Sequence, residues 1–419
     1  MGSEMCIRDR TKGLLVQQMK NEVVSSQSAN VLDNLAPRGF SVGEYQQRLL
    51  RIQRSMLNSD IDLLLLTSEP EFRYFSGFFT QFWQSPTRPW FLLVPAGGRP
   101  VAVIPAIGEA CMRRSQVDDI RTWSSPHPLD DGVSLLADTI HDLLAGSGII
   151  GLLKGRETTL RMPLNDYEAL LTQLSLYQIK DATQLVLGQR QIKSAEEIAK
   201  IESACRVAGS AFEELPNKLS VGCCELEIFR QFKRSCLAFG ADDVSYLVGA
   251  SAQGGYEDII APPTDRQLSE GDILILDTGC VYDGYFCDYD RNFAVGFADA
   301  ASEAAYSQVH QALEAGLHAV KPGVRCCELF ETMRRELNLD DAGSVGRLGH
   351  GLGMQLTESP SITAFDTTVL QAGMVMTLEP GIIYGDGRLM VHEENIVVEN
   401  SGARLLTKRA SPSIPVIAN

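Results

Sequence analysis

The sequence predicts an α/β domain over residues 41–185, followed by an α+β domain over residues 190–419 that contains an internal duplication. Three observations support this fold class. Apolar runs of strand length alternate with helical patterns in the first part. Two similar segments recur about 100 residues apart in the second part. Each of these segments precedes a β-hairpin that would pair acidic side chains. A length of 419 residues suits two domains of ordinary size.

The composition is that of an ordinary soluble protein, with 44% hydrophobic and 21% charged residues. A formal net charge of -16 argues against nucleic acid or an anionic membrane as a partner. No apolar run approaches the roughly 20 residues that span a bilayer, and residues 1–40 show no secretory signal. Four of the ten cysteines are adjacent twins, which rarely bond each other, and none makes a CxxC pair. Disulfide frameworks belong to small secreted domains, so we expect reduced thiols and a cytoplasmic protein.

The first 40 residues are expected to form a tail that is partly artefactual, because the first ten, MGSEMCIRDR, look like a sequencing remnant. A helix is predicted from Ser41, which is a suitable N-cap for the periodic apolar residues that follow. Apolar runs predict strands at 61–66, 90–94, 100–104 and 149–153. Helices are expected at 107–114 and 135–144. This alternation predicts the α/β domain.

A long helix over residues 194–215 is predicted to open the second domain, since Ser194 and Glu197 form a capping box. The repeated segments are 219–229, LSVGCCELEIF, and 320–330, VKPGVRCCELF. Each is expected to follow one helix and begin another. Chance similarity is the alternative for so short a repeat, but the hairpin that follows each copy favours duplication.

The first hairpin, over residues 271–292, contains the run GDILILDTGCVYDGYFCDYDRN. Asp283 and Gly284 suit a two-residue type I′ turn. This register places Asp277 opposite Asp290. Asp288 lies two residues before Asp290 on the same face, so Asp277 and Asp288 become diagonal neighbours, roughly 5.5–8 Å apart at the backbone.

The second hairpin, over residues 374–399, has a predicted turn centred on Asp386, which pairs Glu379 directly with Glu393. Facing acids in a half-buried sheet repel each other, and their burial costs several kcal/mol unless a positive charge lies between them. A metal ion is the simplest such charge. Any one of these acids alone would be interpreted as a turn or cap residue. Their same-face pairing in both hairpins favours the metal site.

His350 adds an imidazole to these carboxylates and is flanked by glycines that allow close approach of a substrate. Four carboxylates and one imidazole suit two divalent ions, such as manganese, iron, cobalt or zinc. Two ions with a bridging water between them generate a nucleophile near neutral pH. The candidate metal ligands are Asp277, Asp288, His350, Glu379 and Glu393.

The chain resembles the creatinase/prolidase/methionine aminopeptidase superfamily in four stretches that occur in the family's order: ILDTG…YFCDYDRNF, GHGLGMQLTESP, TLEPGIIY and VHEENIVV. The resemblance covers residues 190–410 and implies a "pita-bread" catalytic domain. Residues 41–185 resemble the N-terminal domain of creatinase, prolidase and aminopeptidase P. The resemblance implies that the five candidate ligands hold two metal ions, and that Glu379 also takes the proton from the bridging water.

The resemblance also implies a homodimer in which the N-terminal domain of one subunit helps to close the site of the other. Trp83 and Arg88 are the candidate substrate contacts on that domain, and a buried strand edge is an equally good interpretation of this stretch. We expect no nucleic-acid or membrane partner. Manganese is the first expectation for the metal.

Two departures from the family pattern concern histidines that hold the substrate carbonyl in peptidases. The first is missing from residues 258–262, before Pro263-Thr264-Asp265-Arg266, and the second is replaced by Thr357. An oxyanion donor is worth about 10²–10³ in rate. Thr357 is the candidate catalytic donor in place of the second histidine, because its hydroxyl can still donate a hydrogen bond.

Three functions remain open. The first is a metal-dependent hydrolase of Xaa-Pro peptides or related small amides, of the aminopeptidase or dipeptidase kind. The second is a non-peptidase that acts on a small osmolyte-like substrate, as creatinase, ectoine hydrolase and dimethylsulfoniopropionate lyase do. The third is a binding module without catalysis, which the complete ligand set disfavours. The sequence does not specify the native metal or the substrate.

Overall fold

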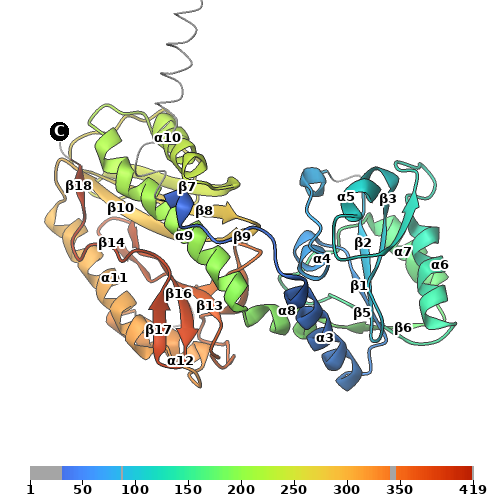
Figure 1. Ribbon diagram of the computed structural model, residues 1–419. Helices are drawn as coiled ribbons and strands as arrows, with labels where there is room; N and C mark the ends of the chain where they lie inside the picture. The colour runs from blue at the N-terminus through green and yellow to red at the C-terminus, as the bar shows by residue number, and fades with distance from the viewer. Residues whose placement is uncertain (1–30, 86–87, 340–345, 418–419) are drawn as a thin grey trace, which may run out of the picture. The chain divides into compact units, whose positions relative to one another are not determined.

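The computed structural model describes residues 31–85, 88–339 and 346–417. The chain divides into two compact units, one over residues 37–190 and the other from residue 191 onward together with the segment before residue 37 (Figure 1). Each unit is described by itself. None of the helices in the described part of the chain is long and apolar enough to cross a membrane.

The N-terminal unit is built on a six-stranded sheet with the order β4-β3-β2-β1-β5-β6. Its central strand β1 runs antiparallel to β2 and parallel to β5. The strands are β1 Leu63–Leu66, β2 Phe91–Pro95, β3 Val101–Pro105, β4 Asp119–Trp123, β5 Ile149–Leu152 and β6 Gln178–Asp181. The four strands predicted from apolar runs are confirmed within one to two residues at each end, whereas β4 and β6 were not predicted.

Helices connect these strands and complete an α/β unit. They are α3 Val42–Asn58, α4 Glu69–Ser76, α5 Glu109–Met112, α6 Val133–Leu144, α7 Leu164–Gln173 and α8 Thr183–Gln191, with short 3₁₀ turns at Gln81–Gln84 and Ala106–Gly108. Ser41 caps α3, and its side chain accepts a hydrogen bond from the Glu44 N–H, so the predicted helix start is confirmed.

Most of the expected tail lies outside the described residues, but its last part packs on the C-terminal unit. The Ala36 N–H donates to Ser203 Oγ at 2.9 Å, and the Tyr282 hydroxyl donates to the Ala36 carbonyl at 2.5 Å. Residues 31–36 are therefore anchored to the chain's own C-terminal unit.

The C-terminal unit contains two five-stranded sheets and a two-stranded ribbon. The first sheet holds β7 Asp243–Gln253, β8 Asp272–Tyr282, β9 Tyr285–Phe286, β10 Tyr289–Val295 and β18 Val416–Ile417. The second holds β11 His350–Gly351, β12 Glu358–Ser361, β13 Val375–Leu378, β16 Glu394–Glu399 and β17 Gly402–Leu405. The ribbon pairs β14 Gly381–Tyr384 with β15 Arg388–Val391.

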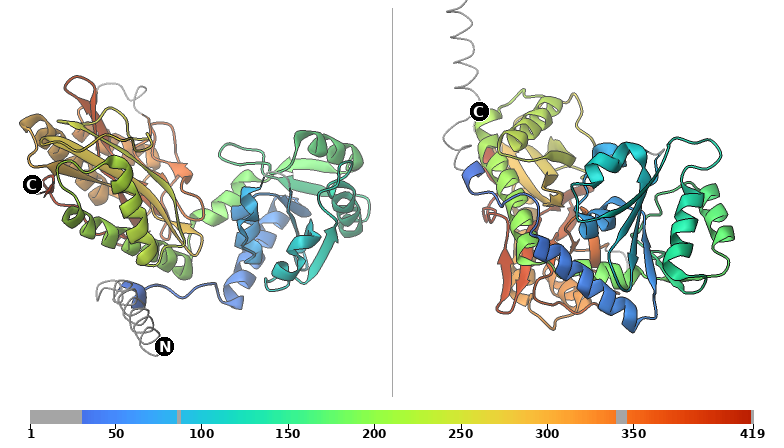
Figure 2. Two further views of the ribbon diagram at one scale, coloured as in Figure 1. Left: turned by 90° about the horizontal axis from the view of Figure 1, so that it is seen from above. Right: turned by 45° about the vertical axis from the view of Figure 1, so that its right-hand side comes forward.

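Each sheet is preceded along the chain by a pair of helices, as the predicted duplication requires. The helices are α9 Ala195–Glu214 and α10 Glu225–Ala238 in the first half, and α11 Ala300–Ala319 and α12 Cys326–Glu336 in the second. A 3₁₀ turn over Leu215–Lys218 follows α9. Helix α9 contacts β8, and α11 contacts β14, β15 and β17 (Figure 2). The capping box of Ser194 and Glu197 is present at the start of α9.

Candidate metal centre

The first hairpin has the predicted register. Tyr282 pairs with Tyr285, so Asp283 and Gly284 form the turn, with φ values of 47° and 78°. Positive φ at both positions is the requirement of a type I′ turn. Asp277 pairs with Asp290 across the ladder. Asp288 lies two residues before Asp290, so local turn chemistry brings three acids onto one face.

The second hairpin also has the predicted register. Leu378 pairs with Glu394 at the end of one ladder, and Gly381 pairs with Val391 at the start of the next. Both pairs have the same register, because each strand has two residues between its two paired positions. Glu379 is therefore opposite Glu393. The ladder closes around Asp386.

The centre of the site is formed by Asp288, His350 and Glu393. Each offers one ligand atom, and these atoms lie within 4.8 Å of one another. His350 Nε2 lies 3.3 Å from an oxygen of Asp288, and His350 Nδ1 lies 2.8 Å from the Gly351 carbonyl. The carbonyl holds the proton on Nδ1, so Nε2 is free to act as a ligand.

Asp277 and Glu379 border this cluster from the two hairpins. Asp277 hydrogen-bonds to Tyr246, while its Oδ1 is buried and has no hydrogen-bond partner among the described residues. Glu379 forms an ion pair with Arg347 at 3.2 Å. The structure thus brings all five predicted ligands to one region of the C-terminal unit, with Asp288, His350 and Glu393 at its centre.

The burial of these acids raises their pKa values. Burial, followed by repulsion from Asp288 and other acids, holds the pKa of Asp277 well above its usual range. The same two causes raise the pKa of Glu393 strongly, and Glu393 Oε1 is also buried without a partner in the described part of the chain. Orphaned oxygens in a set of carboxylates and one imidazole fit divalent cations.

Asn395 fixes the position of Asp288 and was not predicted. Its amide oxygen accepts a hydrogen bond from the Asp288 N–H at 2.9 Å, and its Nδ2 donates to the Asp288 carbonyl. The side chain of Asn395 therefore clamps a candidate ligand from the second sheet. A buried asparagine within the apolar run of β16 was the available signal.

Thr357 lies beside Arg347. Like Asn395, Arg347 was not predicted as a site residue from the sequence. Arg347 Nη2 donates to Thr357 Oγ1 at 3.3 Å, while its Nε lies 3.2 Å from Glu379 Oε1. The next residue, Glu358, pairs with Lys193 at 3.1 Å. The guanidinium thus connects the candidate proton acceptor to the candidate hydrogen-bond donor.

The Pro263-Thr264-Asp265-Arg266 stretch, which follows the residues that lack the first family histidine, serves a structural purpose in this chain. Thr264 donates its N–H and its hydroxyl to Glu225 Oε2 at 3.0 and 2.7 Å, and Arg266 pairs with the buried Asp272 at 2.6 Å. Ile260, in the stretch that lacks the histidine, is 71% exposed.

The predicted substrate contacts of the N-terminal unit differ in their surroundings. Trp83 is 8% exposed and packs against Phe72 and Trp90, with ring centroids 5.4 and 5.9 Å apart. It therefore contributes to the core of this unit, which favours the alternative interpretation of a buried edge. Arg88 lies over the exposed ring of Phe82 at 5.0 Å and stays a prediction.

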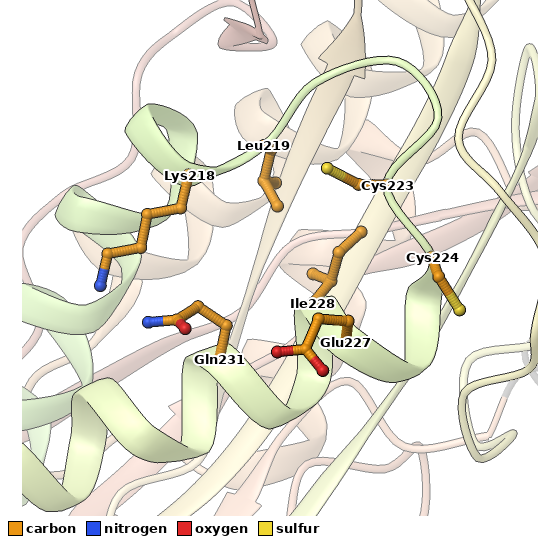
Figure 3. A pocket seen from close by; sticks show the side chains of 7 residues that line it. All are labelled: Lys218, Leu219, Cys223, Cys224, Glu227, Ile228 and Gln231. Carbon is orange, nitrogen blue, oxygen red and sulfur yellow. The ribbon is translucent and has the colours of Figure 1, made fainter.

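A separate cavity of about 390 Å³ lies at the start of α10 (Figure 3). Cys223 and Leu219 line it from the preceding loop, and Glu227 and Gln231 line it from the helix. Cys224, at the start of the helix, also lines it (Figure 3). None of the five candidate ligands lines this cavity.

Comparisons with known proteins agree with this geometry. The Creatinase/Prolidase N-terminal domain matches residues 48–192, and Metallopeptidase family M24 matches residues 199–400. The probable dipeptidase PepE of Mycobacterium tuberculosis is 27% identical over 380 residues, covering 87% of this chain and 94% of that protein.

Solved structures resemble both units. The dipeptidase PepE of Mycobacterium ulcerans matches with a TM-score of 0.77 and 26% identity, covering 91% of this chain and 100% of that chain. A prolidase of Thermococcus sibiricus matches in fold with a TM-score of 0.80 and 23% identity, covering 90% and 100%.

Proposed function

Because the chain belongs to the creatinase/prolidase superfamily and is a metal-dependent peptidase of family M24, we propose that it hydrolyses Xaa-Pro peptides. The observation that carries this proposal is the convergence of Asp288, His350 and Glu393 within 4.8 Å. A relative named Xaa-Pro dipeptidase, from Pyrococcus furiosus, is 27% identical over 275 residues and supports the choice of substrate.

Two divalent ions are the proposed cofactors, with manganese as the first choice. The residues that would hold them are Asp277, Asp288, His350, Glu379 and Glu393. When bound, the ions would supply an activated water and would polarise the scissile carbonyl. The raised pKa of Asp277 and Glu393 in their buried positions supports this assignment, because nearby cations would favour the ionised acids.

The protein's own residues then have separate roles. Glu379 is the proposed acceptor of the proton from the attacking water, and its contact with Arg347 at 3.2 Å orients the carboxylate. Thr357 is the proposed donor near the reacting group, in the place of the family histidine. Asn395 and the Gly351 carbonyl hold Asp288 and His350 in position.

A second candidate is hydrolysis or lysis of a small osmolyte-like acid. The observation that favours it is the chain's lack of both family histidines, at 258–262 and at Thr357. The metal residues would keep their assignment, while the group that is attacked would change. We also propose a homodimer located in the cytoplasm, on the basis of the family resemblance and of the expectation that the cysteines are reduced thiols.

A panel of Xaa-Pro dipeptides and tripeptides, incubated with the manganese-reconstituted protein, tests the proposal. Release of the residue before proline, abolished by a chelator, is the expected result. The Asp288→Asn variant is the matched control and should release none. No release by a protein that holds two metal equivalents would move the assignment to the small-acid candidate, and a protein that takes up no metal would favour a binding module.

A further inference from the structure

One exposed cation lies among the acids of the metal centre. The Arg347 side chain is 37% exposed, and its Nε and Nη2 contact Glu379 and Thr357 at 3.2 and 3.3 Å. Glu379 itself is 21% exposed. Arg347 therefore lies on the exposed side of the acid cluster, and a substrate group that contacts Glu379 also lies close to the guanidinium.

Lys193, which pairs with the neighbouring residue Glu358, is unavailable to a ligand. Lys193 is bound to Glu358 at 3.1 Å, and both side chains are almost fully buried, at 2% and 5% exposure. Arg347 by contrast uses Nε and Nη2 in the contacts found among the described residues. A guanidinium has five N–H donors, so several remain for a ligand.

A guanidinium with free donors in a fixed plane is suited to a carboxylate, which it binds with two parallel hydrogen bonds. A cation beside the acid cluster attracts an anion that the carboxylates alone would repel. Both substrate candidates carry such a group. An Xaa-Pro dipeptide ends in a carboxylate next to the scissile bond, and an osmolyte-like acid has one by definition.

We propose that Arg347 anchors a free carboxylate of the substrate, and that Thr357 positions the guanidinium by accepting its Nη2 hydrogen bond. The inference rests on the proposed function and restricts it to small acids, with dipeptides preferred over longer or amidated peptides. It also explains why a hydroxyl suits position 357. A protonated imidazole there would repel the guanidinium, whereas a hydroxyl accepts its hydrogen bond.

The test compares Ala-Pro with its amide, Ala-Pro-NH2, in the full-length manganese-loaded protein. The wild type should prefer the acid, and Arg347→Met should raise KM for the acid by about 10–150-fold, the range for a lost hydrogen bond to a charged group. KM for the amide should change far less. Arg347→Lys should restore part of the preference, because it keeps the charge without the planar fork.

Thr357→Val tests the positioning role separately. It removes the hydroxyl at nearly constant volume, so KM for the acid should rise while KM for the amide changes far less. Arg404→Met is the matched control, since Arg404 is 40% exposed and also pairs with acids, Glu202 and Glu399. This control should keep the acid preference of the wild type.

A binding measurement separates this inference from the proposed function. Calorimetric titration of the metal-loaded protein with proline and with prolinamide needs no turnover. Tighter binding of proline that is lost in Arg347→Met supports the anchor, even where no peptide is cleaved. Peptide cleavage with an unchanged acid preference in Arg347→Met overturns the anchor and leaves the peptidase proposal standing. Equal binding of proline and prolinamide by the wild type also overturns the anchor.

Discussion

Replacement of Lys193 by methionine should destabilise the C-terminal unit and leave the N-terminal unit unchanged. Lys193 Nζ lies 3.1 Å from Glu358 Oε2, and the two side chains are 2% and 5% exposed. Methionine keeps the length of the side chain but removes the charge. Glu358, which also accepts a hydrogen bond from the Gln355 N–H at 3.1 Å, would then lose its buried contact with the Lys193 ammonium.

The expected cost follows from this burial. Breaking a buried ion pair by removing one partner lowers the free energy of unfolding by about 3–5 kcal/mol, because the remaining charge stays desolvated. For a unit of this size, each kcal/mol lowers Tm by about 2–4 °C. The product is a fall of roughly 6–20 °C for the C-terminal unit.

The distribution of tryptophan makes the two units separable in one experiment. All three tryptophans, Trp83, Trp90 and Trp123, lie in the N-terminal unit. Tryptophan fluorescence therefore follows unfolding of that unit, whereas far-UV circular dichroism follows both. The Lys193→Met protein should lose a circular-dichroism transition at lower temperature, while its fluorescence transition stays in place.

Two further variants test whether burial of the ion pair causes the expected loss of stability. Lys408→Met breaks an exposed pair with Glu213, whose side chains are 74% and 42% exposed, and should cost only about 0–1 kcal/mol. Adding Glu358→Gln to Lys193→Met removes the buried charge that Lys193 no longer neutralises, and should recover part of the loss. A fall below about 1 kcal/mol for Lys193→Met, similar to that of Lys408→Met, would refute the argument from burial.

Three more predictions concern the metal centre. Asp288→Asn should lower bound metal, measured by elemental analysis, with an unchanged circular-dichroism spectrum, and two retained equivalents would overturn its assignment as a ligand. Asn395→Ala should weaken metal affinity by about 10–100-fold in a metal titration, because the clamp on Asp288 is lost, and unchanged affinity would exclude that role. In the metal-free protein, burial and then neighbouring acids raise the pKa of Asp277 and Glu393. The unfolded chain therefore releases these protons first, and the free energy of unfolding should fall as pH rises above about 4. A Tm in chelator that rises steadily from pH 4 to 8 would contradict this sign.

The register of both hairpins could be predicted because it depends on local chemistry. Asp283 and Gly284 accept the positive φ of a type I′ turn, and the alternation of side chains then fixes which acids share a face. A slip of one residue would have moved Glu379 and Glu393 to opposite faces. The metal site followed from this register and from the position of His350 in a glycine-rich segment.

Other features depend on contacts that a local pattern does not encode. Strands β4 and β6 are the edges of their sheet and are partly exposed, so they lack the apolar runs that identify buried strands. Asn395 acts on Asp288 across 107 residues of sequence, and Arg347 reaches Glu379 across 32. Such pairs become visible only when segments that are distant in the sequence are placed together.

The neighbouring residues Glu393 and Glu394 are both buried acids, but their pKa values are shifted in opposite directions. The comparison shows why the acids around Glu393 are suited to bound metal ions and Glu394 is not. Both glutamates are buried, at 3% and 0% exposure. Burial alone would raise the pKa of Glu394, but Arg291 at 3.0 Å and His392 hold it at about 2. Glu393 faces other carboxylates instead, and its pKa is raised well above the usual range by burial and by those acids. Arg291 therefore forms an ion pair with Glu394, whereas no arginine or lysine in the described part of the chain forms one with Glu393. A buried acid that no side chain neutralises is the position where a bound divalent ion gains most, which makes Glu393 the most informative ligand to replace.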